Sequence, residues 1–235
     1  MAGPLVSILV PAYGEAATVG EVVRRALALE DFDIELLVVD DGSIDGTADA
    51  ARAAAGDDAR LRVLTHERNR GKGAAVRTGI EASRGDIVVI QDADMEYDPR
   101  DLPKVLAPLL EGVADVVYGT RLRGGEPQRA HLFWHFVGNR ALSLLTNILY
   151  NTTISDMEVG SKAFRGDLIR ALRLVSDDFA FEPEVTAKLL RTPGVRLYEI
   201  PIPYYGRGYD EGKKITWRDG FKAVWTLFRF RFGPR

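Results

Sequence analysis

Apolar runs and helical periodicities alternate along the first 120 residues of the chain. Residues 5–10 (LVSILV) form an apolar run of the kind found in strands that are buried on both faces. Residues 19–29 place apolar side chains close to a 3.6-residue period, which predicts a helix. The same reasoning predicts strands at 34–39, 61–65, 87–90 and 115–119, and helices at 45–55, 74–83 and 101–110. This order is typical of an α/β fold with a mostly parallel sheet flanked by helices.

The alternation weakens after Arg121. Residues 123–127 (RGGEP) predict a turn. Residues 131–150 are apolar around much of a predicted helix, and residues 217–232 predict a basic amphipathic helix with aromatic side chains. No repeat or low-complexity linker interrupts the chain, so we expect one domain over residues 1–235. Its first half would cover about 1–121 and its second half about 122–235.

Composition narrows the function classes. The 235 residues include no cysteine, which excludes disulfide scaffolds, thiolate zinc sites and cysteine nucleophiles. A formal charge of −3 argues against a nucleic-acid partner, because duplex affinity depends on phosphate neutralisation. Residues 207–235 nevertheless carry eight basic and three acidic side chains. The chain has no apolar segment of about 18 residues and no signal-peptide pattern, so we expect a cytoplasmic protein.

Polar motifs follow three of the predicted strands. In a parallel sheet, ligands bind at the carboxyl ends of the strands. Residues 11–15 (PAYGE), 40–43 (DDGS) and 92–94 (DAD) stand at these positions. Asp92 and Asp94 form a carboxylate pair suited to Mg²⁺ or Mn²⁺, which share their ligand shell with a diphosphate. A lone pair of this kind also occurs in solvated acidic turns, but the two other polar motifs favour a metal site.

A glycine-rich segment, residues 68–74 (RNRGKGA), precedes a predicted helix. Glycines permit close backbone approach, and the free amides of the helix start attract an anion such as phosphate. The spacing differs from that of a Walker A loop. Taken alone, a turn with a surface lysine is an equally good interpretation.

Five ordered motifs together resemble those of the family 2 inverting glycosyltransferases, most closely the polyprenyl-phosphate glycosyltransferases similar to dolichyl-phosphate mannose synthase. They are residues 11–15, 40–47 (DDGSIDGT), 69–73 (NRGKG), 85–86 (GD) and 92–94. The resemblance extends from residue 5 to about 231. It implies a GT-A fold, in which a Rossmann-like nucleotide half continues into an acceptor half. It also implies metal-dependent transfer of a hexose from a UDP- or GDP-hexose.

The resemblance assigns the donor side residue by residue. Asp40 would contact the base or ribose, and Glu96 stands where relatives often have a glutamine that touches the metal. The donor-binding residues that it implies are Pro11, Ala12, Tyr13, Glu15, Asp40, Asp41, Gly71, Lys72, Asp92, Ala93 and Arg121. The metal ligands that it implies, for Mg²⁺ or Mn²⁺, are Asp92, Asp94 and Glu96.

The acceptor half leaves two chemistries open. A phosphate acceptor is largely a dianion near neutral pH and needs no general base, whereas a hydroxyl acceptor needs one, for which Asp156 is the candidate. Residues 154–164 resemble the family's stretch of Asp, variable residues, Lys and Phe, without the Cys-Tyr version of its middle. Residues 181–184 (FEPE) predict a helix start, where a cap and a site role are equal interpretations. The predicted acceptor-phosphate residues are Arg140, Arg207, Lys213 and Lys214, and the catalytic candidates are Asp94, Asp156, Arg207 and Lys213.

The expected acceptor is a polyprenyl phosphate, dolichyl or undecaprenyl, so the two aromatic helices predict peripheral attachment to the cytosolic face of a membrane. The alternative is that they pack on the core or form a homo-oligomer interface. Two other functions compete with the glycosyltransferase. A sugar nucleotidyltransferase would need a Gly-rich loop with an arginine after the first strand, which is missing. An inactive nucleotide-sugar-binding module is disfavoured by the presence of Asp40, Lys72, Asp92 and Asp94.

Overall fold

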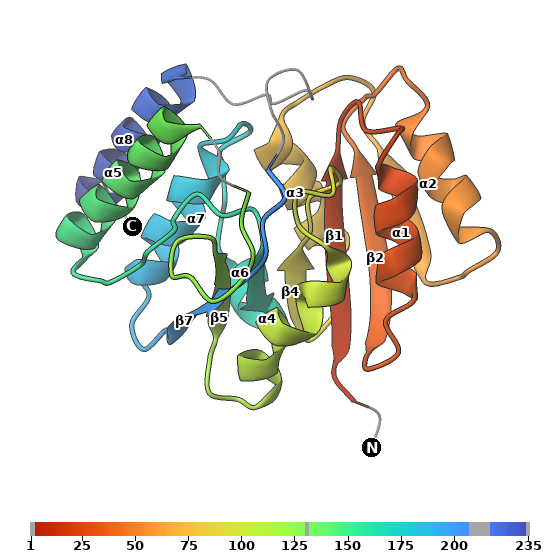
Figure 1. Ribbon diagram of the computed structural model, residues 1–235, viewed down its shortest axis with the longest axis horizontal. Helices are drawn as coiled ribbons and strands as arrows, with labels where there is room; N and C mark the ends of the chain where they lie inside the picture. The colour runs from red at the N-terminus through yellow and green to blue at the C-terminus, as the bar shows by residue number, and fades with distance from the viewer. Residues whose placement is uncertain (1–2, 130–131, 207–216, 234–235) are drawn as a thin grey trace.

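Seven strands form one sheet in the computed structural model, which describes residues 3–129, 132–206 and 217–233 (Figure 1). Their order across the sheet is β3-β2-β1-β4-β6-β5-β7. The strands are β1 (Leu5–Ala12), β2 (Asp33–Asp40), β3 (Leu61–Thr65), β4 (Ile87–Ile90), β5 (Val116–Thr120), β6 (Lys162–Arg165) and β7 (Leu197–Pro201). Of the strands in the described ranges, only β6 is antiparallel to its neighbours. The carboxyl ends of the other six therefore meet at one edge.

The five strands that the apolar pattern predicts are all present, each within two residues of its expected bounds. They form because both sheet faces are covered, as the complete burial of Val6, Ile8, Val88 and Val116 shows. The apolar pattern does not predict β6 or β7. Strand β6 has only four residues and includes a lysine, and β7 lies half buried at the edge of the sheet.

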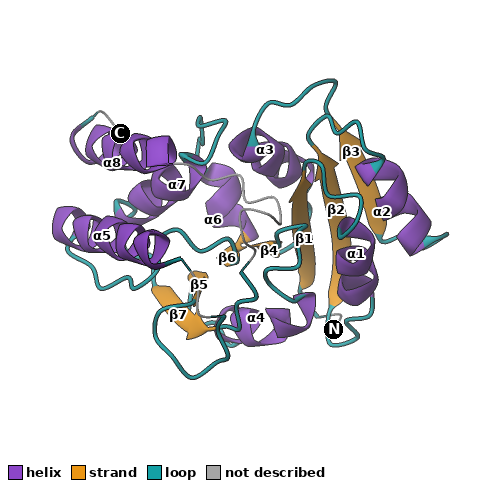
Figure 2. Cartoon of the chain, turned by 45° about the horizontal axis from the view of Figure 1, so that its top comes forward, coloured by secondary structure: helices purple, strands orange, loops and turns teal. Residues whose placement is uncertain are grey.

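Helices cover both faces of this sheet (Figure 2). Helices α1, α2 and α4 lie on one face, and α3, α6 and α7 lie on the other. The helices are α1 (Val19–Leu27), α2 (Thr47–Ala55), α3 (Lys72–Ala82), α4 (Leu102–Leu110), α5 (Phe133–Tyr150), α6 (Gly166–Ala171), α7 (Phe181–Leu190) and α8 (Trp217–Phe232), with a short 3₁₀ turn at Pro99–Asp101. The observed bounds differ from the expected ones by up to two residues. Helix α1 ends at Leu27, two residues early, α2 begins at Thr47, two residues late, and α3 begins at Lys72, two residues early.

Helices α5 and α8 form an outer layer beside α7, at the β7 end of the sheet (Figures 1 and 2). A second apolar cluster beneath them contains Ile154, Met157 and Leu227. The Tyr150 hydroxyl donates a hydrogen bond to the Leu227 carbonyl at 2.7 Å, which ties the end of α5 to α8. The inner faces of both helices are therefore part of the packed protein. No helix within the described ranges is long and apolar enough to cross a bilayer.

Asp115 joins three strands at the opposite end of the sheet from the polar motifs. Its carboxylate accepts hydrogen bonds from Arg165 Nη1 at 3.0 Å and from Arg196 Nε at 3.0 Å. The Arg196 amide donates to the same group at 2.9 Å. Hydrogen bonds from Arg196, followed by those from Arg165, hold the pKa of Asp115 well below its usual range, against the opposing effect of burial.

Asp115→Asn tests this clamp. We expect the substitution to lower the free energy of unfolding at pH 7 by about 1.5–3 kcal/mol, because it removes hydrogen bonds to a charged, buried acceptor. A carboxyl group whose pKa is lowered in the native state stabilises that state at pH values above the group's ordinary pKa near 4. This stabilisation is lost as the pH falls below that value. The difference from wild type in urea denaturation should therefore shrink below about pH 4.

Asp167→Asn is the matched control, since Asp167 pairs with the same Arg165 but its side chain is 67% exposed. This variant should change stability by no more than about 0.5 kcal/mol. Equal losses from the two substitutions would contradict a specific role for Asp115.

Candidate active site

The end of β2 and the loop that follows it carry two buried carboxylates at the carboxyl edge of the sheet. Asp40 is 2% exposed and accepts a hydrogen bond at 3.0 Å from the backbone amide three residues later. Asp41 accepts hydrogen bonds from the amides of Arg70 at 3.0 Å and Gly71 at 2.7 Å, and contacts His66 Nδ1 at 2.6 Å. The sequence predicts a donor contact for Asp41. In the structure its carboxylate holds the loop that leads into α3.

That loop packs directly on another segment of backbone. Gly71 has a φ of +101°, and a Cβ at this position would lie 2.4 Å from the Asp177 carbonyl oxygen. A Cβ at Gly73 would lie 2.3 Å from the carbonyl oxygen of Ser176. Glycine is therefore required by contact as well as by conformation. The result is that Lys72, the first residue of α3, stands at a fixed position at the sheet edge.

Lys72 lies between two carboxylates. Its Nζ is 2.8 Å from Asp92 Oδ1 and 3.4 Å from Glu182 Oε1. Burial favours the neutral amine, but the charges of Asp92 and Glu182 outweigh it and raise the pKa of Lys72 above its ordinary value. The other oxygen of Glu182 pairs with Lys162, which is fully buried and also donates to the Val159 carbonyl at 2.5 Å. A continuous chain of alternating charges thus runs from the end of β4 to β6.

The acidic turn after β4 is shaped by its neighbours. A Cβ at Gly160 would lie 2.0 Å from Asp92 Oδ2, so the carboxylate packs directly against this glycine and only glycine fits there. Asp94 accepts a hydrogen bond from the Glu96 amide at 3.0 Å, and the Tyr204 hydroxyl donates to Glu96 Oε2 at 3.0 Å. No group of three His, Asp or Glu side chains in the described part of the chain could hold a metal. Of the three predicted ligands, Asp92 and Asp94 lie on one turn, and Glu96 accepts a hydrogen bond from Tyr204.

Arg121 and Asp156 form a buried ion pair. Arg121 Nε and Nη2 each donate to a different Asp156 oxygen at 2.7 Å. Asp156 is completely buried, and the guanidinium lies 5.0 Å from the ring centroid of Tyr204. Burial opposes the charged guanidinium, but Asp156 outweighs that effect and raises the pKa of Arg121 further. The pair ties the end of β5 to the segment before β6, next to the ring that contacts Glu96.

The motif after β1 lies against the same loops. The Gly14 amide donates to Ser43 Oγ at 2.9 Å, and the Glu15 amide donates to Thr47 Oγ1 at 2.9 Å. Glu15 is 8% exposed, whereas Tyr13 is 43% exposed. The predicted donor residues at the carboxyl ends of β1, β2 and β4 thus share one edge of the sheet, and they are Pro11, Ala12, Tyr13, Glu15, Asp40, Asp92 and Ala93.

The predicted acceptor residues are placed only in part. Arg140 lies on the exposed surface of α5, where its guanidinium is 5.9 Å from the ring centroid of Phe136. Arg207, Lys213 and Lys214 lie outside the described residues. The segment that leads to them is placed, since Arg129 Nη1 donates to the Gly206 carbonyl at 2.8 Å.

Sequence reasoning does not assign a site role to Lys162 or Glu158, and leaves Glu182 undecided. Lys162 and Glu158 stand in the stretch that resembles the family's Asp-to-Lys-Phe motif. The motif therefore marks this stretch in the sequence but does not indicate what these two residues do. In the FEPE motif, Glu182 has the contacts of a site residue and Glu184 has a structural role. Glu182 faces the two lysines, whereas Glu184 accepts the amides of residues 175 and 176 and so fixes the backbone behind the Gly71 loop.

Known proteins resemble this chain in both sequence and structure. The family model "Glycosyl transferase family 2" matches residues 7–191. An undecaprenyl-phosphate mannosyltransferase of Micrococcus luteus is 32% identical, over 96% of this chain and 98% of its own. A dodecaprenyl-phosphate galacturonate synthase of Rhizobium johnstonii is 28% identical, over 97% of this chain and 68% of its own.

The glucosyl-3-phosphoglycerate synthase of Mycobacterium tuberculosis, crystallised with Mn²⁺, UDP and phosphoglyceric acid, superposes with a TM-score of 0.77. The alignment covers 99% of this chain and 80% of the synthase at 23% identity. It agrees with the sheet order described above and confirms the predicted GT-A fold. The family match and the two lipid-phosphate relatives confirm the resemblance seen in the motifs. The chain belongs to glycosyl transferase family 2 and is a glycosyltransferase.

Proposed function

We propose that this protein is a metal-dependent, inverting glycosyltransferase that moves a hexose from a nucleotide diphosphate sugar to a polyprenyl phosphate. The observation that carries the proposal is the contact of Lys72 with Asp92 at the carboxyl edge of the sheet. It joins the glycine loop of an anion site to the acidic turn of a metal site. Those two features are what a nucleoside diphosphate with its cation requires.

Asp92 and Asp94 are the residues that would hold Mg²⁺ or Mn²⁺. Mg²⁺ commonly binds proteins through one or two carboxylates and takes its other ligands from water and substrate phosphates. Asp92 and Asp94, two residues apart on one turn, supply carboxylates in the number that this arrangement needs. The bound ion would stabilise the negative charge that develops on the departing nucleoside diphosphate. The M. tuberculosis synthase, which shares the fold, was crystallised with Mn²⁺ and with Mg²⁺.

The chain's own residues complete the donor site. Lys72 and the first amides of α3 bring positive charge to the diphosphate. Asp41 fixes the loop before Lys72, and Asp40 lies buried beside the β1 motif, where the base or ribose would contact it. A UDP- or GDP-hexose matches these groups. Inversion follows when the acceptor attacks the sugar from the face opposite to the diphosphate.

The environment of Asp156 favours a phosphate acceptor over a hydroxyl. Both of its oxygens accept hydrogen bonds from Arg121, and its side chain is completely buried. A carboxylate bound in this way is a poor general base for a hydroxyl, whereas a phosphate dianion needs no base. The M. luteus and R. johnstonii relatives are named for polyprenyl-phosphate chemistry. Arg207, Lys213 and Lys214 are the basic residues proposed to bind the acceptor phosphate.

Asp94→Ala should abolish transfer of a radiolabelled hexose to undecaprenyl phosphate, with a loss of about 100-fold or more, because it removes a carboxylate that anchors the donor's cation. EDTA should have the same effect on wild type, and Mn²⁺ or Mg²⁺ should reverse it. Nuclear magnetic resonance of the product should show the anomer opposite to that of the donor.

Asp57→Ala, on the exposed turn after α2, is the matched control and should leave transfer unchanged. Undiminished transfer by Asp94→Ala would overturn the metal assignment. Transfer to a soluble sugar hydroxyl in preference to the lipid would overturn the acceptor assignment.

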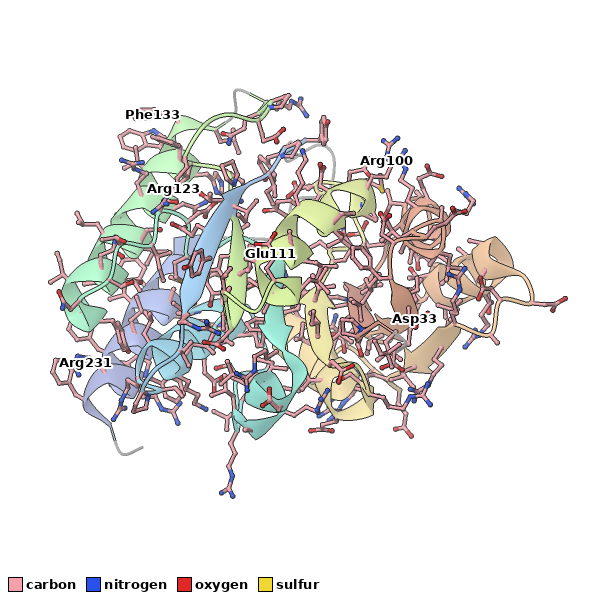
Figure 3. The ribbon with its side chains drawn as sticks, turned by 90° about the horizontal axis from the view of Figure 1, so that it is seen from below. Asp33, Arg100, Glu111, Arg123, Phe133 and Arg231 are labelled. Atoms are coloured by element: carbon pink, nitrogen blue, oxygen red, sulfur yellow. The ribbon has the colours of Figure 1, made fainter. Side chains whose placement is uncertain are left out.

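We also propose that α5 and α8 dock on an anionic membrane surface, where a polyprenyl phosphate would be found. Their outer faces expose large apolar side chains, which are Phe133, Trp134, Phe136, Val137, Leu144 and Ile148 on α5, and Phe221, Trp225, Phe228 and Phe232 on α8. Exposed basic side chains accompany them, namely Arg140, Lys222, Arg229 and Arg231. Figure 3 shows Phe133 and Arg231 on the side of the molecule away from Asp33. Aromatic and basic side chains on one face are typical of helices that lie in a membrane interface.

The Trp134→Ser, Trp225→Ser double variant tests this surface by flotation with anionic liposomes at low salt. Burial of an aromatic side chain contributes about 1.5–3 kcal/mol, so the coefficient for partition of the protein onto the liposomes should fall at least tenfold. Both tryptophans are exposed, so the fold should persist. Val113→Asp, an exposed position on the loop after α4, is the control and should float like wild type. A wild-type protein that stays in the soluble fraction would refute the docking proposal.

A further inference from the structure

Two buried carboxylate oxygens beside the donor site receive no hydrogen bond. Across the described residues, three buried side-chain oxygens lack a hydrogen-bond donor, and they belong to Gln91, Glu158 and Glu182. A buried acceptor without a donor costs free energy, so such groups are rare in native proteins. Two of the three are carboxylates, and one of these, Glu182, faces the lysine that also contacts Asp92. A ligand bound there would supply the missing donors.

The positions of the two carboxylates relate them to the diphosphate site. Glu182 is 3% exposed, and its Oε1 lies 3.4 Å from the same Lys72 ammonium that contacts Asp92. Glu158 stands two residues before Gly160, whose backbone lies against Asp92 Oδ2. Glu182 therefore lies next to the lysine proposed to meet the donor phosphates, and Glu158 lies close enough to Glu182 for that charge to raise its pKa. The sugar of the donor must also lie beside those phosphates.

The charges around these oxygens are already matched by the protein. The Lys162 ammonium is held by Glu182 and by the Val159 carbonyl, and the Lys72 ammonium lies between Asp92 and Glu182. Lys162 is enclosed by its partners, and Lys72 is the lysine proposed to meet the donor diphosphate, so neither is available to a carboxylate on the sugar. Burial, followed by repulsion from Glu182, raises the pKa of Glu158 to about 7, against the opposing attraction of Lys162 and Arg121.

We propose that Glu158 and Glu182 accept hydrogen bonds from hydroxyl groups of the transferred sugar, so that the site selects an uncharged hexose and rejects a hexuronate. This inference rests on the proposed glycosyltransferase function and specifies its donor class. Hydroxyl groups supply the donors that Glu158 Oε1 and Glu182 Oε1 lack. A sugar carboxylate would supply none and would place a new anion beside two acidic side chains. Sites built to hydrogen-bond a hydroxyl discriminate strongly, because their buried polar groups are otherwise left unpaired.

Selection of a neutral hexose would distinguish this chain from one of its relatives. The R. johnstonii enzyme is named as a galacturonate synthase, whereas the M. luteus enzyme is named as a mannosyltransferase. Both are similar to this chain over nearly its whole length. Overall similarity therefore does not decide between a uronate and a neutral hexose. The two carboxylates favour the neutral sugar.

Isothermal titration with the full chain and Mn²⁺ tests the selection, using pairs of probes that differ only in the sugar's carboxylate. The pairs are UDP-glucose with UDP-glucuronate, and GDP-mannose with GDP-mannuronate, and UDP and GDP alone serve as references. For the base that the protein binds, wild type should bind the hexose form at least tenfold more tightly than the hexuronate. It should also bind the hexose form more tightly than the nucleotide alone. Equal or tighter binding of the hexuronate overturns the inference.

Glu158→Gln and Glu182→Gln identify the residues responsible. Either substitution should reduce the preference for the hexose to about threefold or less, and Glu158→Gln should leave the affinity for UDP or GDP alone within twofold of wild type. Glu182→Gln also breaks the pair with buried Lys162, so circular dichroism must first show that it folds; Glu158→Gln and the wild-type probe pairs test the inference without it. Glu81→Gln, on an exposed position of α3, should behave as wild type.

The failures are distinguishable. A wild-type protein that binds no nucleotide and no nucleotide sugar overturns the proposed function, and this inference with it. A protein that binds nucleotide sugars and retains the wild-type preference in Glu158→Gln and in any folded Glu182→Gln overturns the assignment of the two carboxylates alone.

Discussion

A buried ion pair between Lys162 and Glu182 underlies the arrangement of the whole site. An ammonium group that is fully enclosed in protein is costly unless a carboxylate and further hydrogen-bond acceptors surround it, and removing one partner costs about 3–5 kcal/mol. The pair holds the first turn of α7 against β6. Since Glu182 also faces Lys72, the same interaction sets the position of the lysine that reaches Asp92. Strand β6, helix α7 and helix α3 are thus coupled through charge at the point where their chain segments meet.

A second coupling acts through the backbone. Asp41 accepts hydrogen bonds from the amides at the end of the glycine loop. The same loop packs on residues 176–178, and Glu184 accepts hydrogen bonds from the amides of residues 175 and 176. One carboxylate in the first half of the chain and one in the second half therefore fix the loop from opposite sides. Such support keeps a binding group within a fraction of an ångström of its working position, as transfer chemistry requires.

The sequence was sufficient for strands β1 to β5 and for the polar edge, because both leave local patterns, but not for the half-buried parallel strand β7. A run such as residues 87–90 can be buried on two faces only inside a sheet, and Asp92 and Asp94 follow it directly. It was insufficient where contacts join distant segments. The pairing of Asp156 with Arg121 and of Glu182 with Lys162 depends on a strand that reverses direction, which no periodicity announces. Glu96 shows the same limit, since its partner Tyr204 is 108 residues away.

Strand β6 has a consequence for how the chain reaches its native state. It lies between β4 and β5, although it follows both in the sequence, and it runs against them. Until residues 162–165 are in place, β4 has an open edge and β5 has no neighbour on that side. The first five strands alone cannot form one continuous sheet, because β6 lies between β4 and β5. The core of a nascent chain therefore becomes continuous only after β6 has been synthesised. Contacts of long sequence separation slow folding, and the insertion of β6 between β4 and β5 comes late in synthesis of the chain.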